Sequence, residues 1–111
     1  MLQIKFYGVR GSISVSGPNY TEFGGDTTCF QIMASESQRI GIVDAGTGIR
    51  KLGKDFLQMN TGQTEIFIAF THFHWDHIQG FPFFAPAYDQ KYNIKILAKG
   101  GSLKHECLRD I

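Results

Sequence analysis

Three of the four histidines in the chain fall within six residues, from His72 to His77, and Asp76 lies among them. Neutral imidazoles and a carboxylate are the ligands that zinc and other first-row divalent ions take in proteins. A polar turn with a purely structural role would have no need of this composition. The cluster therefore predicts a metal site with the ligands His72, His74, Asp76 and His77.

The spacing of these four ligands favours two ions over one. His72 and His74 are two residues apart, so in an extended backbone their side chains project to the same side and can share an ion. Asp76 and His77 are adjacent and are expected to diverge, which places them on a second ion. Each ion then has two protein ligands here, whereas a catalytic zinc usually has three and an open position for water. Further ligands must come from elsewhere.

A buried strand is expected to hold this cluster in place. Residues 66–70 form a continuous apolar run that ends just before His72, which predicts a central strand covered on both faces. Residues 27–34 and 39–44 have the composition of two strands and predict an antiparallel hairpin. Between residues 47 and 59 apolar side chains recur at helical spacing, which predicts one amphipathic helix.

The two ends of the chain also carry secondary-structure signals. Residues 2–9 alternate apolar and polar side chains, which predicts a strand with one buried face, and a long loop follows them. Residues 94–98 predict a further strand. Ser102 is a candidate cap for a helix over residues 103–111, in which His105 would be a surface residue and not a ligand.

Composition excludes several classes of protein. The formal net charge is +1 and the basic residues form no run, so no strong nucleic-acid-binding signature exists. Cys29 and Cys107 are far apart and are expected to be reduced, partly buried thiols. No apolar stretch reaches the length of a secretory signal or the roughly 20 residues of a membrane span. We therefore expect one cytoplasmic domain without a membrane partner.

Three segments resemble the metallo-β-lactamase superfamily. Residues 71–80 resemble its His-x-His-x-Asp-His motif with the following glycine, and residues 43–46 resemble its strand-end Asp-x-Gly motif. Residues 8–12 and 24–29 are similar to the glycine-rich N-terminal region of its phosphodiesterase-like branch, which includes tRNase Z-type enzymes. The resemblance implies an α/β (α+β) fold: half of an αββα sandwich, with a mostly antiparallel or mixed sheet and flanking helices.

The resemblance also implies an activity. Members of the family are zinc-dependent hydrolases, so the expected reaction is cleavage of a phosphodiester bond in a nucleotide or RNA-type substrate by a metal-activated water. Two zinc ions are implied, with manganese or iron as alternatives, and Asp76 would also orient the nucleophile. Residues 1–111 match only the N-terminal part of the domain, and the third histidine, bridging aspartate and final histidine of its second half have no counterpart here.

The unmatched ligands leave two alternatives open. The chain could be a truncated or non-catalytic metal-binding module, or a homo-oligomer could complete the site from two chains, which would also cover the exposed sheet of a half-sandwich. Without a second chain, we expect little or no turnover from these 111 residues alone.

Three more residues and one segment carry predictions. Asp44 is expected to hydrogen-bond the metal-binding segment and orient its ligands, with a turn or cap as the alternative. Arg10 is expected to be solvated or ion-paired, with a phosphate contact as the alternative. Residues 81–88 are expected to pack in the core without forming a regular helix, because they contain two prolines, although an apolar lip beside the site is the alternative. Trp75 is expected to pack under the metal-binding segment.

Overall fold

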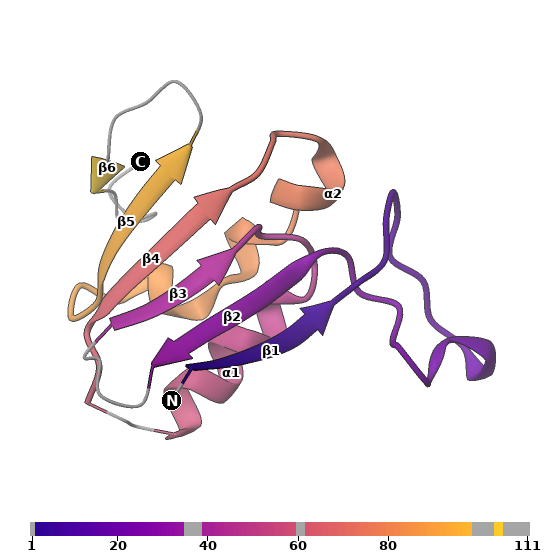
Figure 1. The fold of residues 1–111 in the computed structure, drawn as a ribbon, viewed down its shortest axis with the longest axis horizontal. Coiled ribbons are helices and arrows are strands. Elements are labelled where there is room, and N and C mark those ends of the chain that lie inside the picture. The colour runs from indigo at the N-terminus through magenta and orange to yellow at the C-terminus, as the bar shows by residue number, and fades with distance from the viewer. Residues whose placement is uncertain (1, 35–38, 60–61, 99–103, 106–111) are drawn as a thin grey trace.

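The apolar runs of the sequence form neighbouring strands of one mixed sheet (Figure 1). The computed structural model describes residues 2–34, 39–59, 62–98 and 104–105. The six strands follow one another in sequence order across the sheet, with the bounds β1 Leu2–Gly8, β2 Cys29–Ala34, β3 Arg39–Val43, β4 Glu65–Phe70, β5 Asn93–Ala98 and β6 Lys104–His105. The predicted hairpin is confirmed, because β2 pairs antiparallel with β3.

The connections determine which strand ends meet. β1 and β2 are antiparallel, whereas β3, β4 and β5 run parallel to one another and β6 returns antiparallel to β5. The first parallel crossover contains α1 (Ile49–Met59), and the second contains α2 (Trp75–Ile78) and the 3-10 helices η2 (Phe81–Phe83) and η3 (Ala85–Tyr88). Because β3 and β4 are parallel, the segments that begin at Asp44 and Thr71 leave the sheet at the same edge.

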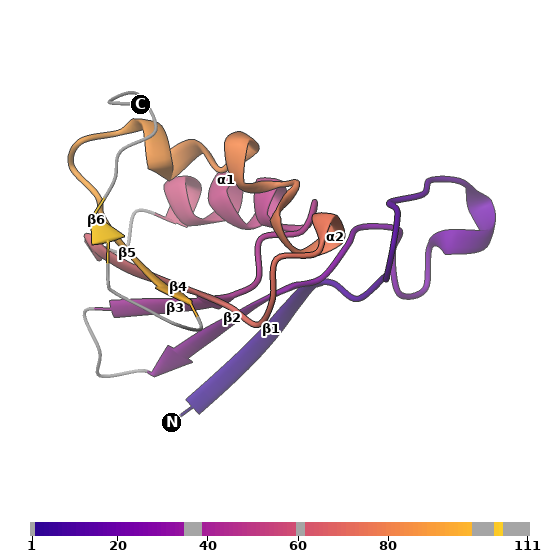
Figure 2. The same ribbon diagram turned by 90° about the horizontal axis from the view of Figure 1, so that it is seen from above.

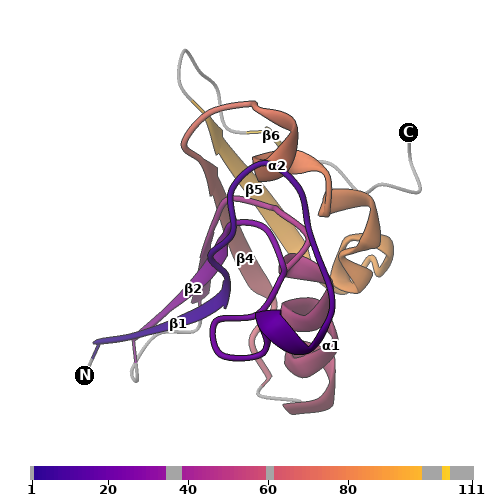
Figure 3. The same ribbon diagram turned by 90° about the vertical axis from the view of Figure 1, so that its right-hand side faces the viewer.

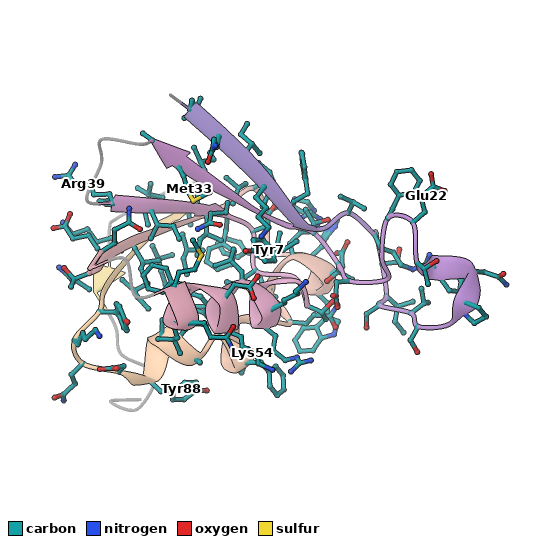
Figure 4. The ribbon with its side chains drawn as sticks, turned by 90° about the horizontal axis from the view of Figure 1, so that it is seen from below. Tyr7, Glu22, Met33, Arg39, Lys54 and Tyr88 are labelled. Carbon is teal, nitrogen blue, oxygen red and sulfur yellow. The ribbon has the colours of Figure 1, made fainter. Side chains whose placement is uncertain are left out.

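The core lies between the sheet and these helices, which Figure 2 shows together on one face. The predicted amphipathic helix is confirmed, since α1 buries Ile49, Leu52 and Phe56. Packing of residues 81–88 in the core is also confirmed at Phe84, which is fully buried, and the segment forms only short 3-10 turns, as its prolines predict. Tyr7 lies between the sheet and α1 (Figure 4), where its hydroxyl donates to Asp55 Oδ2 at 3.2 Å.

The opposite face of the sheet is exposed, and here two predictions are wrong. Tyr7 fixes which side of β1 faces α1, so the alternate residues Leu2, Ile4 and Phe6 point away from it and are 66%, 52% and 64% exposed. The apolar side of β1 is therefore not its buried side. Strand β4 buries Ile66 and Ile68 on the helix side only, and Phe67 on the other side is half-buried. No helix among the described residues covers that side.

The C-terminal helix prediction is wrong at the two positions that the structure describes. Lys104 and His105 form β6 and pair with β5, whereas the rest of residues 99–111, including Cys107, lies outside the described residues. Cys29 is a free thiol as expected and is fully buried, and burial raises its pKa to about 12. Among the described residues, no helix is both long and apolar enough to cross a membrane.

Candidate metal centre

The predicted ligands leave the sheet at the carboxyl end of β4. His72 to His74 continue in extended form, and His74 has φ −60° and ψ 148° at the N-cap of α2. The chain then makes a single helical turn, which carries Asp76 and His77. In Figure 1 this turn lies at the edge of the sheet where β3 and β4 end. The apolar character of β4 and the polar segment that follows it thus set the position of all four residues.

Asp44 holds this segment in place from the end of the neighbouring strand. Its Oδ1 accepts the backbone N–H of Thr71 at 2.8 Å, and its Oδ2 accepts the Thr71 hydroxyl at 2.8 Å. The same Oδ2 lies 2.9 Å from Nδ1 of His77. The Asp44 side chain is 3% exposed, so the carboxylate itself is shielded from solvent. The predicted role of Asp44 in orienting the ligands is therefore supported by its position.

These contacts decide which ring nitrogen each neutral histidine presents. The Thr71 hydroxyl has one proton, which it donates to Asp44, so its oxygen must accept from Nδ1 of His72 at 3.0 Å. Nδ1 of His77 likewise donates to Asp44, which as a carboxylate can only accept. In both rings Nε2 keeps its lone pair. A single carboxylate thus prepares two imidazoles to bind a metal through Nε2.

The prediction that the side chains of Asp76 and His77 diverge is wrong. Nε2 of His77 lies 3.4 Å from Asp76 Oδ2, because the helical turn of α2 brings the adjacent side chains together. When its Nδ1–H donates to Asp44, a neutral His77 presents the lone pair of Nε2 to a carboxylate oxygen. Two acceptors at this distance repel each other unless a proton or a cation lies between them. A divalent cation bound by both groups would remove this repulsion, as a proton on Nε2 would.

Ser12, from the loop after β1, makes a further contact with Asp76. Its backbone N–H donates to Asp76 Oδ2 at 3.0 Å, across 64 residues of sequence. This bond lowers the pKa of Asp76 below its ordinary value, because it stabilises the charged carboxylate. Ser12 has φ 74° and Asp44 has φ 61°. Residues other than glycine rarely adopt this backbone conformation. Both strained positions thus contact the predicted ligands.

The three imidazoles lie close together. The ring centroid of His72 is 4.5 Å from that of His74 and 3.9 Å from that of His77. His72 is therefore close both to His74, its partner on the first predicted ion, and to His77, which is predicted to bind the second. Within the part of the chain that the structure describes, no three His, Cys, Asp or Glu side chains are arranged to hold one ion. The donors fit zinc in type, and each ion would take two of them from this segment.

Gly46 and Gly80 allow the two loops of the site to approach each other. The N–H of Ala45 donates to the carbonyl of His77 at 2.8 Å, and the N–H of Gly80 donates to the carbonyl of Ala45 at 2.9 Å. A Cβ at Gly80 would lie 2.1 Å from the backbone carbonyl oxygen of Gly46. A Cβ at Gly46 would lie 2.6 Å from the backbone carbonyl oxygen of Asp76. Only glycine permits these contacts, which explains the glycine in each motif.

Two other predictions have clear outcomes. Trp75 does not pack under the segment; it is 68% exposed, because α2 is one turn long and turns this side chain outward. Arg10 is held by its own loop: its Nε donates to the carbonyl of Ile13 at 2.7 Å, and its guanidinium lies 5.3 Å from the centroid of the Tyr20 ring.

Sequence reasoning missed the roles of Thr71 and Ser12. Thr71 directly precedes the histidines, so its position was a signal that could have been used. Ser12 lies in a long, glycine-containing loop, but no sequence pattern pairs it with Asp76, which is 64 positions away.

Comparison with known proteins gives one structural likeness. No family model and no curated protein matches the chain. Among solved structures, the chain is similar to the crystal structure of a candidate metallo-beta-lactamase from Thermotoga maritima, with 22% sequence identity and a TM-score of 0.42. The match covers 75% of this chain and 39% of that chain, so this chain spans about two fifths of its length.

Proposed function

We propose that the chain is the metal-binding part of a metallo-β-lactamase superfamily hydrolase that cleaves phosphodiester bonds. The observation that carries the proposal is the set of contacts around Asp44, which leaves Nε2 of His72 and of His77 free as metal ligands. Partners that fix the orientation and tautomer of an imidazole in this way are typical of histidines that bind a metal. His72 and His74 would hold one ion, and Asp76 and His77 a second.

Different residues of the chain would have different roles in such a site. Bound zinc, or manganese or iron in its place, would supply the Lewis acidity that makes water nucleophilic at neutral pH. Asp44 holds the imidazoles in the tautomer that can bind a metal. Asp76 accepts a hydrogen bond from the attacking water and orients it, and the Ser12 amide keeps the Asp76 carboxylate ionised.

The loop after β1 supports a phosphodiester as the substrate. Residues 8–12 and 24–29 resemble the phosphodiesterase-like branch, and through Ser12 this loop reaches the predicted metal ligand Asp76. A small molecule or a nucleotide fits this proposal better than a long nucleic acid, because the basic residues form no run.

A second candidate function is metal binding without turnover. The observation that favours it is that no three potential ligands among the described residues are arranged around one ion. Two protein ligands per ion bind weakly, so these 111 residues by themselves are expected to turn over slowly. Assembly of two chains would supply further ligands, and turnover per chain would then rise with protein concentration.

The two candidates are separated by measuring metal content and hydrolysis in the same samples. Protein expressed from its complete reading frame is loaded with zinc or manganese and given bis(p-nitrophenyl) phosphate. The hydrolase proposal predicts nitrophenol release that chelation removes and that Asp76→Asn lowers about 100-fold or more, since this change removes a ligand and the group that orients water. Bound metal without Asp76-dependent release at any protein concentration would establish the second candidate.

A further inference from the structure

The loop between β1 and β2 is a folded structure in its own right. We call residues 9–26 the N-terminal arm. It doubles back on itself, because Arg10 N–H donates to the Asp26 carbonyl at 3.1 Å and Val15 N–H donates to the Gly25 carbonyl at 2.9 Å. Its far end contains η1 (Pro18–Tyr20). Figures 1 and 3 show the arm passing beside α2 and extending beyond the sheet.

The arm lines an open cavity of about 660 Å³. This volume lies within the range of roughly 300 to 1,000 Å³ that is usual for small-molecule sites. The residues of the lining that matter for recognition are Arg10, Gly11, Tyr20, Glu22, Phe23 and Gly24. None of them is a predicted metal ligand, so the cavity is distinct from the metal centre.

The side chains of this cavity suit a planar aromatic group. Phe23 is 77% exposed and Tyr20 is 41% exposed, so both rings offer free surface for stacking. The guanidinium of Arg10 lies over the Tyr20 ring and is held there by its bond to the Ile13 carbonyl. Glu22 adds a negative charge that offsets Arg10. The cavity therefore has little net charge, and simple anions have little reason to bind in it.

The backbone of the cavity is open to a ligand. A Cβ at Gly11 would meet nothing within 4 Å, so the packing of the described chain leaves room for a side chain there. Gly24 also faces open space, and it has φ +79°. Bare backbone on this wall permits the close approach of a flat ligand.

The wall of the cavity and the contact with the candidate metal centre belong to one continuous stretch of chain. Gly11 in its wall is bonded to Ser12, whose amide donates to Asp76 Oδ2 at 3.0 Å. Neighbouring Cα atoms are about 3.8 Å apart, so a ligand beside Gly11 is close to the metal-binding segment. We propose that the N-terminal arm binds the planar aryl or heterocyclic group of a phosphodiester substrate while the bond to be cleaved lies at His72–His77. This inference rests on the proposed function.

The test measures binding without metal, so that it does not depend on hydrolysis. Adenosine 5′-monophosphate, p-nitrophenyl phosphate and ribose 5-phosphate are titrated into the full-length protein in the presence of EDTA, and backbone amide signals are followed by NMR. The two aromatic probes are expected to shift the signals of Gly11, Tyr20 and Phe23, whereas ribose 5-phosphate is not. A preference between the aromatic probes would tell a heterocycle from a simple aryl group.

Two substitutions should weaken this binding. Phe23→Ala is expected to raise the dissociation constant of the aromatic probes roughly 5 to 100-fold, the range for loss of one stacking contact. Gly11→Leu should weaken it as well, because its side chain would occupy open space that the ligand needs. Phe83→Ala removes a ring that is 64% exposed outside the cavity, and it should bind as wild type does.

The outcomes separate this inference from the proposed function. Equal binding of ribose 5-phosphate and the aromatic probes, or unchanged binding by Phe23→Ala, would overturn the role of the arm and leave Asp76-dependent hydrolysis unaffected. Absence of hydrolysis with intact binding to the arm would contradict the proposed function alone. If both proposals hold, Phe23→Ala should raise KM for bis(p-nitrophenyl) phosphate and leave kcat nearly unchanged.

Discussion

Replacing His72 and His74 together by alanine is expected to weaken zinc binding by 100-fold or more, because the two imidazoles are the proposed ligands of one ion and the contact with Thr71 favours the His72 tautomer that can bind it. Both side chains are exposed, so the change should leave the fold intact. Titration calorimetry with zinc on the wild type and the double variant measures the difference.

His105→Ala is the control for this experiment. It removes the fourth histidine of the chain, which we do not predict to be a ligand, and it should bind zinc as the wild type does. Equal zinc affinity of the wild type and the His72→Ala, His74→Ala variant would refute the assignment of these ligands.

Asp44→Asn is expected to weaken zinc binding by roughly 10 to 100-fold, or about 1.4 to 2.7 kcal/mol, without removing a ligand. The Asp44 carboxylate accepts the Thr71 N–H, the Thr71 hydroxyl and the His77 ring N–H. An asparagine side chain has one oxygen and an NH₂ group that only donates, so it cannot accept all three bonds. His77 and Thr71 then lose the partner that fixes them.

The same substitution should disturb the backbone little, because asparagine tolerates the positive φ of 61° at this position. Asp55→Asn is the matched control; Asp55 accepts the Tyr7 hydroxyl between β1 and α1 and contacts no predicted ligand. Circular dichroism would verify the fold of both variants. If Asp44→Asn bound zinc as tightly as Asp55→Asn does, orientation of the ligands by Asp44 would be ruled out.

The sequence predicted the elements whose signals are local. The spacing of Ile49, Leu52 and Phe56 determines one face of α1, and the run that includes Ile66 and Ile68 determines β4, so both elements were identified correctly. The ligand set could be proposed because residue type alone marks His72–His77 as metal donors. In each case the information lies within a few residues of sequence.

The features that were missed depend on contacts between distant segments. The alternation in β1 shows that Leu2, Ile4 and Phe6 share a face, but it cannot show whether another layer covers that face. The approach of Asp76 to His77 requires knowledge of the helical turn, and the bond from Ser12 joins segments 64 residues apart. Tertiary structure alone supplies these contacts.

The most direct test of the metal centre is the response of the histidine ring nitrogens to zinc. Long-range ¹H–¹⁵N NMR spectra identify the tautomer of each neutral ring and the nitrogen that binds a metal. We expect His72 and His77 to carry the proton on Nδ1 before zinc is added and to show the large shift of metal coordination at Nε2 afterwards. Coordination through Nδ1, or ring signals that zinc leaves unchanged, would contradict a metal centre prepared by Asp44.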